Sequence, residues 1–336
     1  MPRPVDLPGL KTGDRVQDAL LVLDVDQRTF DAGEYTVLTL GNSTGRISSA
    51  PFWADAQAQV EGIRRGHVVQ VIGTVADFRG RPQLRVSSLR LLPEAAVDVR
   101  ALLPSVGDVT RYWETLDGWR RDIAKPRLAR ALSLFYDDDD FRGRYGACPA
   151  SVAGHHASIG GLLKHTVEVG AIARTIARVS GADQDIVMAG VLLHDIGKLD
   201  AYRWHGVFDH TEAGHLIGHV VLGTLMLDRR LEEADAPSCT PEERALLHHL
   251  ILSHHGRLEY GSPILPLTLE AEVVHWADNA SAKTASMADA LREAAAFTEG
   301  PVSQRRLRQL DNRRAYRGTS DWGATEEPAV PSQASH

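Results

Sequence analysis

Histidines gather between residues 155 and 275 of this 336-residue chain, and one adjacent His-Asp pair is central to their pattern. His194 and Asp195 end an apolar helical run, and Gly197 and Lys198 follow them at once. Neighbouring side chains cannot share one face inside a helix, but where the backbone turns at a helix end both can converge on one point. A metal ion suits such a point, and the rest of the chain must then supply the remaining ligands.

The other candidate ligands come one after another from successive helical segments. All but two of the 15 histidines lie between residues 155 and 275. The residues that fall at or near an apolar helical stripe are His165, His194, Asp195, His219, His254 and Asp278. Helical bundles build metal sites from inward-facing carboxylates and imidazoles of this kind. The spacing therefore predicts a divalent-metal site inside a bundle.

The chemistry of these ligands narrows the choice of metal. The set contains no thiolate, so it favours Mn²⁺, Co²⁺, Fe, Mg²⁺ or Zn²⁺ at an open site over a structural zinc site. Six ligands are more than one ion with open positions needs, so we expect a second ion bridged by Asp195. A single histidine on a half-buried helix face more often packs or forms hydrogen bonds, and we expect this of His205, His210, His248 and His275. His215 lies four residues before His219 and could coordinate, although we expect a supporting role.

Residues 10–93 are predicted to form a small β-barrel. Runs rich in Val, Leu and Ile cover residues 18–30, 34–52, 67–78 and 82–92, and Gly, Asn and Asp mark the breaks between them. About five strands in so short a stretch favour an oligonucleotide-binding (OB) fold, which is a five-stranded Greek-key barrel of this size. Another small barrel or a half-sandwich is the alternative.

The remainder is predicted to be helical. Residues 94–107 form a Pro-containing linker, 108–317 an all-α bundle and 318–336 a disordered tail. Helical spacing of apolar residues covers 161–181, 183–198, 211–234, 240–256 and 268–291. Asp183 and Thr240 are expected helix starts, and Gly181, Gly197 and Gly256 expected helix ends. The fold class is thus a multidomain α and β protein, with an OB-type barrel followed by an all-α bundle.

Composition limits the class of protein. With 43% hydrophobic and 24% charged residues the chain looks globular, and its length favours two domains. The N-terminal residues lack the apolar stretch of a secretory signal, and no apolar run reaches the ~18–20 residues of a membrane helix. Two cysteines are too few for a disulfide framework, which fits a reducing cytoplasm. A formal net charge of −7 argues against a uniformly basic surface but allows a local basic groove for nucleic acid.

Several stretches resemble a known enzyme superfamily. The pattern of His165, His194-Asp195 and Asp278 resembles the HD-domain metal-dependent phosphohydrolases, and the histidines of the third and fourth helical segments resemble the further ligands of their two-metal members. The stretches "HHASIGGLLKHT", "LLHDIGK", "GHLIGH", "LILSHHGRLEYGSP" and "WADNASAK" resemble the YhaM-type 3′→5′ exoribonucleases, which carry an OB-fold before the HD domain. "HHGRLEYGSP" stands where the cyclic-dinucleotide phosphodiesterase branch has a Gly-Tyr-Pro signature, which disfavours that branch.

The resemblance implies a two-metal hydrolase. His165, His194, Asp195 and Asp278 would bind the first ion, and Asp195 would bridge to a second one completed by His219 and His254. Two ions ~3.5–4 Å apart can activate a water, neutralise phosphate charge and stabilise the leaving oxygen. Lys198 is placed to meet a non-bridging phosphate oxygen, with a solvated helix-end lysine as the alternative. Asp195 and Lys198 are therefore the predicted catalytic residues.

Candidate substrate contacts in the helical part surround this site. The resemblance makes His156 a candidate, although the glycine-rich stretch around it could simply cap a helix. His255 could contact phosphate or support a ligand. Tyr260 could stack on a terminal base or be an ordinary surface aromatic.

Candidate substrate contacts in the barrel are Trp53, Phe78 and Arg79. Barrels that hold a single strand combine stacking aromatic rings with Arg or Lys. The alternative is that these aromatic residues belong to the barrel core. The first 105 residues hold 12 Lys and Arg against 12 Asp and Glu, so the barrel is not basic overall.

Residues and resemblance together predict a metal-dependent 3′→5′ exonuclease. It would hydrolyse single-stranded RNA, with single-stranded DNA left open, to nucleoside 5′-monophosphates; the direction, the product and Mn²⁺ come from the resemblance. We expect a cytoplasmic protein without a membrane partner, and we leave a homo-oligomer open. One rival is a phosphohydrolase of free nucleotides, which would not need a strand-binding barrel. The other is a non-catalytic nucleic-acid-binding adaptor, which would not need the full ligand set or Lys198.

Overall fold

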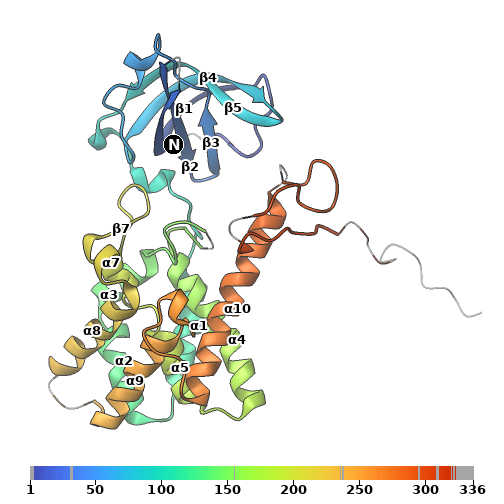
Figure 1. Cartoon of the computed structure of the whole chain (residues 1–336). Helices are drawn as coiled ribbons and strands as arrows, with labels where there is room; N and C mark the ends of the chain where they lie inside the picture. Colours follow the sequence, from blue (N-terminus) through green and yellow to red (C-terminus); the bar gives the residue numbers. More distant parts are fainter. Residues whose placement is uncertain are drawn as a thin grey trace, which may run out of the picture. The chain divides into compact units, whose positions relative to one another are not determined.

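The computed structural model describes residues 4–30, 33–154, 156–234, 236, 238–293, 296–307, 310–318, 320 and 322. The chain divides into two compact units, Met1–Ala285 and Ser286–His336, which we describe separately. Most of the predicted tail, 318–336, lies outside the described residues. Figure 1 shows the N-terminal strands of the first unit in blue and cyan and its helices from green to orange.

Five strands form a closed barrel at the start of the first unit (Figure 1). They are β1 (Arg15–Phe30), β2 (Gly33–Asn42), β3 (Gly45–Ser49), β4 (Val68–Phe78) and β5 (Arg81–Leu91). The order around the barrel is β1-β2-β3-β5-β4, with β3 and β5 parallel and the other neighbours antiparallel. The predicted OB-like barrel is thereby confirmed.

Alternation of side chains builds the barrel core. In β2, Leu38 and Leu40 are fully buried, while Thr39 between them is only partly buried, as expected for a strand with one face inside. β1 is long enough to pair with both β2 and β4, and a register shift between Val22 and Asp24 marks an irregularity where it bends. Short apolar runs with turn residues between them were thus sufficient to predict this part.

Ten α-helices follow the barrel in the described part of the chain. They are α1 (Thr110–Asp122), α2 (Pro126–Tyr136), α3 (Asp139–Ala147), α4 (Gly161–Ser180), α5 (Gln184–Leu193), α6 (Lys198–Ala201), α7 (Glu212–Leu216), α8 (His219–Glu232), α9 (Pro241–Ser253) and α10 (Leu269–Arg292). The predicted helical bundle is confirmed. It also contains one short ladder, β6 (Tyr202–Arg203) with β7 (Asp209–His210), which an all-α reading did not include.

The interior of the bundle is built around α5. Every residue from Val187 to Leu193 is buried, so this helix is apolar on all sides and must lie inside. It contacts α2, α4 and α9. A helix enclosed in this way delivers whatever follows its C-terminus into the interior of the bundle.

Local signals explain most of the helix ends. Asp183 begins α5 by accepting hydrogen bonds from the backbone N–H groups of Asp185 and Ile186. Thr240 begins α9 with a reciprocal capping box that involves Glu243. Gly181 ends α4 in a left-handed conformation, with φ of +77°. These predictions are confirmed.

Two glycines act differently from the prediction. The segment 211–234 is not one helix, because Gly218 adopts φ of +81° and α8 begins only at His219. Gly197 does not end a helix but precedes α6 with φ of −66°. A Cβ atom at Gly197 would lie 2.0 Å from the carbonyl oxygen of His219, so this glycine allows the two backbones to touch.

The second unit has a small core of its own. Ala290, Leu307, Leu310 and Ala315 are buried together. The basic run at 304–317 is not helical in its described residues, 304–307 and 310–317; isolated bridges join Val302 to Tyr316 and Leu307 to Arg313.

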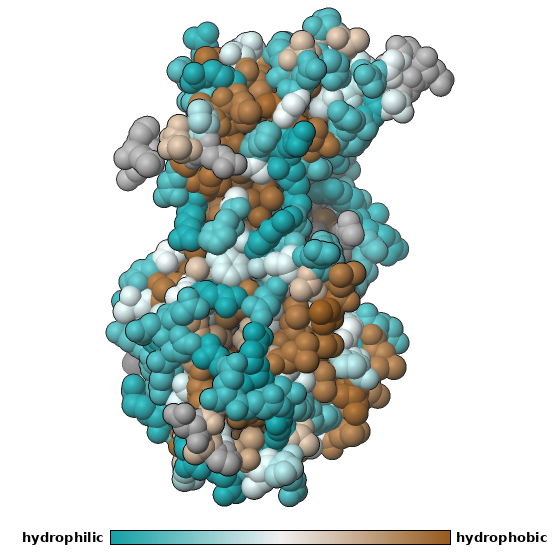
Figure 2. Space-filling model, turned by 90° about the vertical axis from the view of Figure 1, so that its left-hand side faces the viewer, coloured by the Kyte–Doolittle hydropathy of each residue, from teal (hydrophilic) through white to brown (hydrophobic). Residues whose placement is uncertain are grey.

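Two surface properties complete the description. Among the described residues, no helix has both the length and the apolar character needed to span a membrane. Figure 2, which faces the α7–α8 side, shows hydrophobic side chains gathered over part of the helical surface. The exposed hydrophobic residues of α7, α8 and the turn between them are Leu216, Ile217, Val221 and Leu225.

Candidate metal centre

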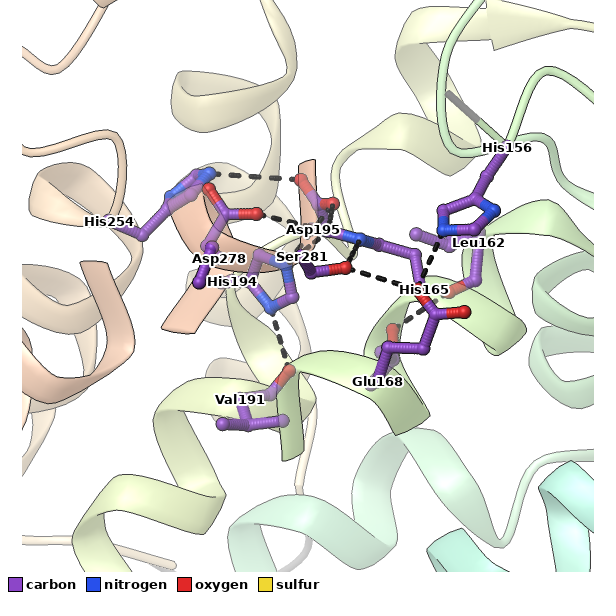
Figure 3. Close-up of polar contacts among 12 residues, drawn as sticks. His156, Leu162, His165, Glu168, Val191, His194, Asp195, His254, Asp278 and Ser281 are labelled. Atoms are coloured by element: carbon purple, nitrogen blue, oxygen red, sulfur yellow. Dashed lines mark hydrogen bonds and ion pairs between the residues drawn. The ribbon is translucent and has the colours of Figure 1, made fainter. Parts of the chain in front are cut away.

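The six predicted ligands converge on one point in the bundle. His165 lies in the first turns of α4, His194 and Asp195 follow α5, His219 opens α8, His254 follows α9, and Asp278 lies within α10. Figure 3 shows the side chains of His165, His194, Asp195, His254 and Asp278 facing one another. Residues that are up to 113 positions apart in the sequence thus form one cluster, as their spacing predicted.

The carboxylate of Asp195 divides this cluster into two sides. Its Oδ2 atom lies 3.2 Å from Nε2 of His194 and 3.6 Å from Nε2 of His165. Its Oδ1 atom lies 3.4 Å from Nε2 of His219 and 3.7 Å from Nε2 of His254. Asp278 joins the first side, with Oδ1 3.0 Å from Nε2 of His165. The two oxygens of this carboxylate therefore face different pairs of imidazoles.

Backbone carbonyls fix which nitrogen of two histidines faces the centre. Nδ1 of His194 lies 2.7 Å from the carbonyl oxygen of Val191, and Nδ1 of His254 lies 2.6 Å from that of Ile251. A carbonyl oxygen only accepts, so each Nδ1 carries the hydrogen and each Nε2 directs a lone pair toward the centre of the cluster. Both histidines follow the last turn of a helix, where the carbonyl three residues earlier is available. The same local geometry therefore prepares two ligands.

The donor atoms fit a divalent metal. Three atoms of the cluster, Oδ1 of Asp195, Nε2 of His219 and Nε2 of His254, are buried without a hydrogen bond. Buried polar atoms are nearly always paired, so these three need a partner such as a metal ion. Two groups have donor atoms within 4.8 Å of one another: His165, His194 and Asp195, and His219, His254 and His255. Imidazole and carboxylate donors without thiolate suit divalent ions at an open site.

Contacts within the cluster keep both acids ionised. Burial opposes ionisation of Asp195, but Lys198 and His194 outweigh it and hold the pKa of Asp195 well below its usual range. Burial likewise opposes ionisation of Asp278, but His165 outweighs it and lowers the pKa of this acid. Both side chains are therefore carboxylates at neutral pH, the form that binds metals.

The four histidines of the cluster differ in whether nearby charges offset the effect of burial on their pKa. Burial lowers the pKa of His219 to about 3 and holds the pKa of His254 well below its usual value. Burial also lowers the pKa of His165, against the effect of Asp278. Burial acts on His194 in the same direction, but the adjacent Asp195 outweighs it and raises the pKa of His194. A neutral imidazole is the ligand form, and burial favours it at three positions.

Lys198 contacts the cluster through Asp195. Its Nζ atom lies 2.5 Å from Oδ2 of Asp195, and the side chain is buried. Burial alone would lower the pKa of this amine, but Asp195 outweighs it and raises the pKa. The lysine is thus a fixed cation next to the predicted metal ligands rather than a solvated helix-end residue.

Three further predicted residues lie around the cluster. His255 belongs to the second donor group, and its Nδ1 lies 2.6 Å from the carbonyl oxygen of Tyr260. The Tyr260 ring is about half exposed, with Cζ of Arg257 5.7 Å and Nζ of Lys283 6.0 Å from its centre. On the other side, Nε2 of His156 lies 2.7 Å from Oε2 of Glu168.

The three predicted barrel residues are not part of this cluster. Trp53 is 47% exposed, and its ring centre lies 4.9 Å from that of Tyr35. Phe78 is 53% exposed, and Cζ of Arg79 lies 5.3 Å from its ring centre. These rings are therefore surface features of the barrel rather than core residues.

Sequence reasoning missed three residues that contact the candidate ligands directly or through one other side chain. Ser281 lies 3.2 Å from Nδ1 of His165, and its hydroxyl donates to Glu168. His275, expected to be structural, has Nδ1 2.9 Å from the carbonyl oxygen of His254. Each of the three lies three residues from a predicted ligand on the same helix, and that spacing was the available signal.

Comparison with known proteins places the chain in a family. A model of the HD domain matches residues 162–283, a range that contains all six candidate ligands. Over 313 residues the chain is 30% identical to the 3′-5′ exoribonuclease YhaM of Bacillus subtilis (strain 168), with 92% of this chain and 96% of that protein covered. The chain belongs to the YhaM family of 3′-5′ exoribonucleases.

Other YhaM relatives give the same result. YhaM of Shouchella clausii (strain KSM-K16) is 30% identical over 318 residues, which cover 91% of this chain and 94% of that protein. YhaM of Halalkalibacterium halodurans is 28% identical over 316 residues. Because these matches extend well beyond the HD match, they include the barrel as well as the helices. The YhaM resemblance read from the sequence motifs is confirmed.

Proposed function

We propose that this chain is a metal-dependent 3′-5′ exoribonuclease that shortens single-stranded RNA to nucleoside 5′-monophosphates. The observation that supports this most directly is the shared carboxylate of Asp195, found in a chain of the YhaM family. Each of its oxygens faces a separate pair of imidazoles. Hydrolases that act on phosphodiesters use such a bridging ligand to hold two ions close together.

The ligand sets follow from the two sides of Asp195. His165, His194, Asp195 and Asp278 would hold one ion, and Asp195, His219 and His254 a second. When bound, such ions neutralise phosphate charge and lower the pKa of a water molecule. Mn²⁺ is our first choice, because the resemblance favours it and the imidazole and carboxylate donors suit it.

The chain's own residues orient the reaction. The carbonyls behind His194 and His254 keep their Nε2 lone pairs directed at the centre. Lys198 holds a fixed positive charge beside Asp195, where it would stabilise the extra negative charge of the phosphate in the transition state. Asp195 and Lys198 are therefore the proposed catalytic residues.

Substrate contacts are proposed next to the second donor group. Nδ1 of His255 lies within hydrogen-bond distance of the Tyr260 carbonyl oxygen. This contact ties the residue that carries the exposed Tyr260 ring to the second donor group. A base could stack on this ring, with Arg257 and Lys283 beside it to meet phosphates. His156, whose ring is held by Glu168, is the proposed contact on the other side.

The barrel would hold RNA farther from the reacting end. Trp53 and Phe78 present exposed rings, and Arg79 lies beside Phe78. Such combinations bind single strands by stacking and charge, largely independent of sequence. A ring can stack on bases of either nucleic acid, so single-stranded DNA remains a second substrate to test.

The remaining expectations belong to the same proposal. The domain division at residues 10–93, 94–107 and 108–317 places the barrel before the catalytic bundle. A cytoplasmic location agrees with the two free cysteines. Self-association is left open, and the exposed hydrophobic residues of α7 and α8 are the surface to mutate if the mass in solution exceeds that of one chain.

The test uses a single-stranded RNA oligonucleotide labelled at its 5′ end, incubated with the purified full chain and Mn²⁺. We expect a ladder of shortening products that disappears with a chelator and in Asp195→Asn. Glu272→Gln, a substitution of an exposed carboxylate on α10, is the matched control and should behave like the wild type. An intact strand under conditions where the wild type binds Mn²⁺ would overturn the proposal.

The same assay separates the two rivals. Hydrolysis of free nucleotides without shortening of RNA would identify a nucleotide phosphohydrolase. RNA binding with neither activity would identify an adaptor. The family membership and the exposed aromatic rings of the barrel favour the exonuclease over both.

A further inference from the structure

Glu168 joins two parts of the site that lie on different elements. It lies on α4, one turn after His165, and its Oε2 atom accepts two hydrogen bonds. One comes from the Ser281 hydroxyl at 3.2 Å and the other from Nε2 of His156 at 2.7 Å. Figure 3 shows Glu168 with His156 on one side and Ser281 and His165 on the other.

The hydrogen bonds around Ser281 have a definite direction. A serine hydroxyl has one hydrogen, and Ser281 donates it to Glu168. The Ser281 oxygen can then only accept from Nδ1 of His165, which lies 3.2 Å away. With its hydrogen on Nδ1, His165 directs the lone pair of Nε2 toward the proposed metal position, with Nε2 3.0 Å from Oδ1 of Asp278 and 3.6 Å from Oδ2 of Asp195.

The hydrogen bonds from Glu168 through Ser281 orient the His165 ring, as backbone carbonyls orient the rings of His194 and His254. His194 and His254 follow helix ends and use free carbonyls. His165 lies within α4, where carbonyls are used by the helix itself. Its Nδ1 therefore needs an acceptor from elsewhere, and Ser281 of α10 supplies it.

The second hydrogen bond to Glu168, from His156, helps to order the residues before α4. His156 has a positive φ of +52°, which is uncommon outside glycine and must be held by surrounding contacts. Its carbonyl accepts from the backbone N–H groups of Ala150 and Ser158 at 3.1 and 2.8 Å. The bond to Glu168 adds a hold on the ring. Burial opposes ionisation of Glu168, but His156 and Lys164 outweigh it and lower its pKa, so it acts as a pure acceptor.

We propose that Glu168 is a positioning residue shared by the metal and substrate contacts: it orients the ligand His165 through Ser281 and holds His156 directly. The proposal rests on the exoribonuclease function. It predicts that mutation can separate the hydrogen bonds that orient His165 from the one that holds His156, and that substitution of Glu168 affects both.

The experiment measures Mn²⁺ affinity and steady-state kinetics on the full chain. Ser281→Ala should weaken Mn²⁺ binding about 10-fold, in the range typical of residues that orient a ligand, and leave KM for RNA at saturating Mn²⁺ within two-fold. His156→Ala should raise KM about 10-fold, from loss of a contact to the charged substrate, with unchanged Mn²⁺ affinity. Glu168→Leu should show both defects. Glu168→Gln keeps an acceptor oxygen and should recover most of both.

Controls keep the proposal falsifiable. Glu272→Gln should match the wild type in both measurements, and thermal melts check that each variant is folded. If Glu168→Leu does not fold, Glu168→Gln, Ser281→Ala and His156→Ala decide. Mn²⁺ affinity within two-fold of the wild type in both Ser281→Ala and Glu168→Leu would overturn the proposal, as would a Glu168→Leu variant with normal KM. If the wild type binds Mn²⁺ but leaves RNA intact, the exoribonuclease function fails, while the affinity measurements still test the hydrogen bonds that orient His165.

Discussion

Asp195 has two roles: it faces the proposed metal positions, and it pairs with the buried Lys198. Asp195 is 1% exposed and Lys198 7% exposed. Removing one member of a buried ion pair leaves an uncompensated charge, which costs about 3–5 kcal/mol of stability. Loss of activity in an Asp195 variant therefore has to be separated from loss of stability.

A double substitution makes that separation. We expect Asp195→Ala to lower the free energy of unfolding of the metal-free chain by about 3 kcal/mol. Asp195→Ala combined with Lys198→Met should recover most of this loss, since no buried charge remains, yet stay inactive. Urea denaturation in the presence of a chelator measures the stability of both variants, and the RNA assay measures their activity. Equal stability of the single and double variants would show that Lys198 does not depend on Asp195.

The depressed pKa of His219 predicts a pH dependence of stability. Below about pH 6.5 the unfolded chain takes up a proton at this position, whereas the folded chain, with the pKa of His219 at about 3, does not. The unfolded state then binds more protons, so the stability of the metal-free protein falls as pH decreases from about 6.5 towards 3. His219→Asn should make this slope shallower by up to about 1.4 kcal/mol per pH unit. An unchanged slope in denaturation curves between pH 7 and pH 4.5 would contradict the assignment.

Residue identities were the most predictable part of the site. That His194, Asp195 and four partner residues cluster could be predicted from helical spacing, because the apolar stripes of successive helices face inward; their role as metal ligands stays a prediction. Glu168 and Ser281 could not, since a glutamate or serine one turn from a histidine is common on any helix. Only the three-dimensional structure shows that the Ser281 hydroxyl on α10 donates a hydrogen bond to Oε2 of Glu168 on α4.

At the scale of elements, close contact between the α5–α6 turn and α8 places the ligands. Gly197 lies against the start of α8, and a Cβ there would be 2.0 Å from the His219 carbonyl oxygen and 2.3 Å from the Gly223 nitrogen. The sequence motif contains this glycine, but its role as a contact between two backbones is visible only in three dimensions.

This contact gives a prediction with a matched control. Gly197→Ala should push α8 away, destabilise the protein by about 1–3 kcal/mol and weaken Mn²⁺ binding by displacing His219. Gly143→Ala, in the exposed interior of α3 with open space around it, should be neutral or stabilising by up to about 1 kcal/mol. Thermal unfolding and metal titration compare the two. A Gly197→Ala protein with normal Mn²⁺ affinity would show that His219 is positioned in another way.

Helix boundaries were predicted well where a side chain makes the cap and less well where a glycine acts. Asp183 and Thr240 bond to their own helix, so a local sequence identifies them. The break at Gly218 was missed because the apolar pattern continues on both sides of it. The basic run at 304–317 belongs to the stretch predicted to be helical, yet Leu307, Arg313 and Tyr316 form isolated β-bridges.

For the whole molecule, the proposed function needs both barrel and bundle to contact one RNA strand. Replacing both Trp53 and Phe78 by Ala in the full chain removes two exposed rings without disturbing the core. Loss of one stacked base costs about 1–3 kcal/mol, so KM for a long RNA should rise at least 10-fold. Cleavage of a short chromogenic phosphodiester should not change. Val179→Ala, which alters an exposed hydrophobic residue of α4, is the control. Equal effects on both substrates would mean that the barrel does not hold the strand.

The order of the ligands along the chain also governs when the site can exist. Asp278 lies on α10 and is the last of the proposed ligands to be synthesised, long after His165. A growing polypeptide on the ribosome therefore carries an incomplete centre until α10 has emerged. For an enzyme proposed to degrade RNA, this sequence of events would keep the nascent chain inactive beside the very messenger from which it is being translated.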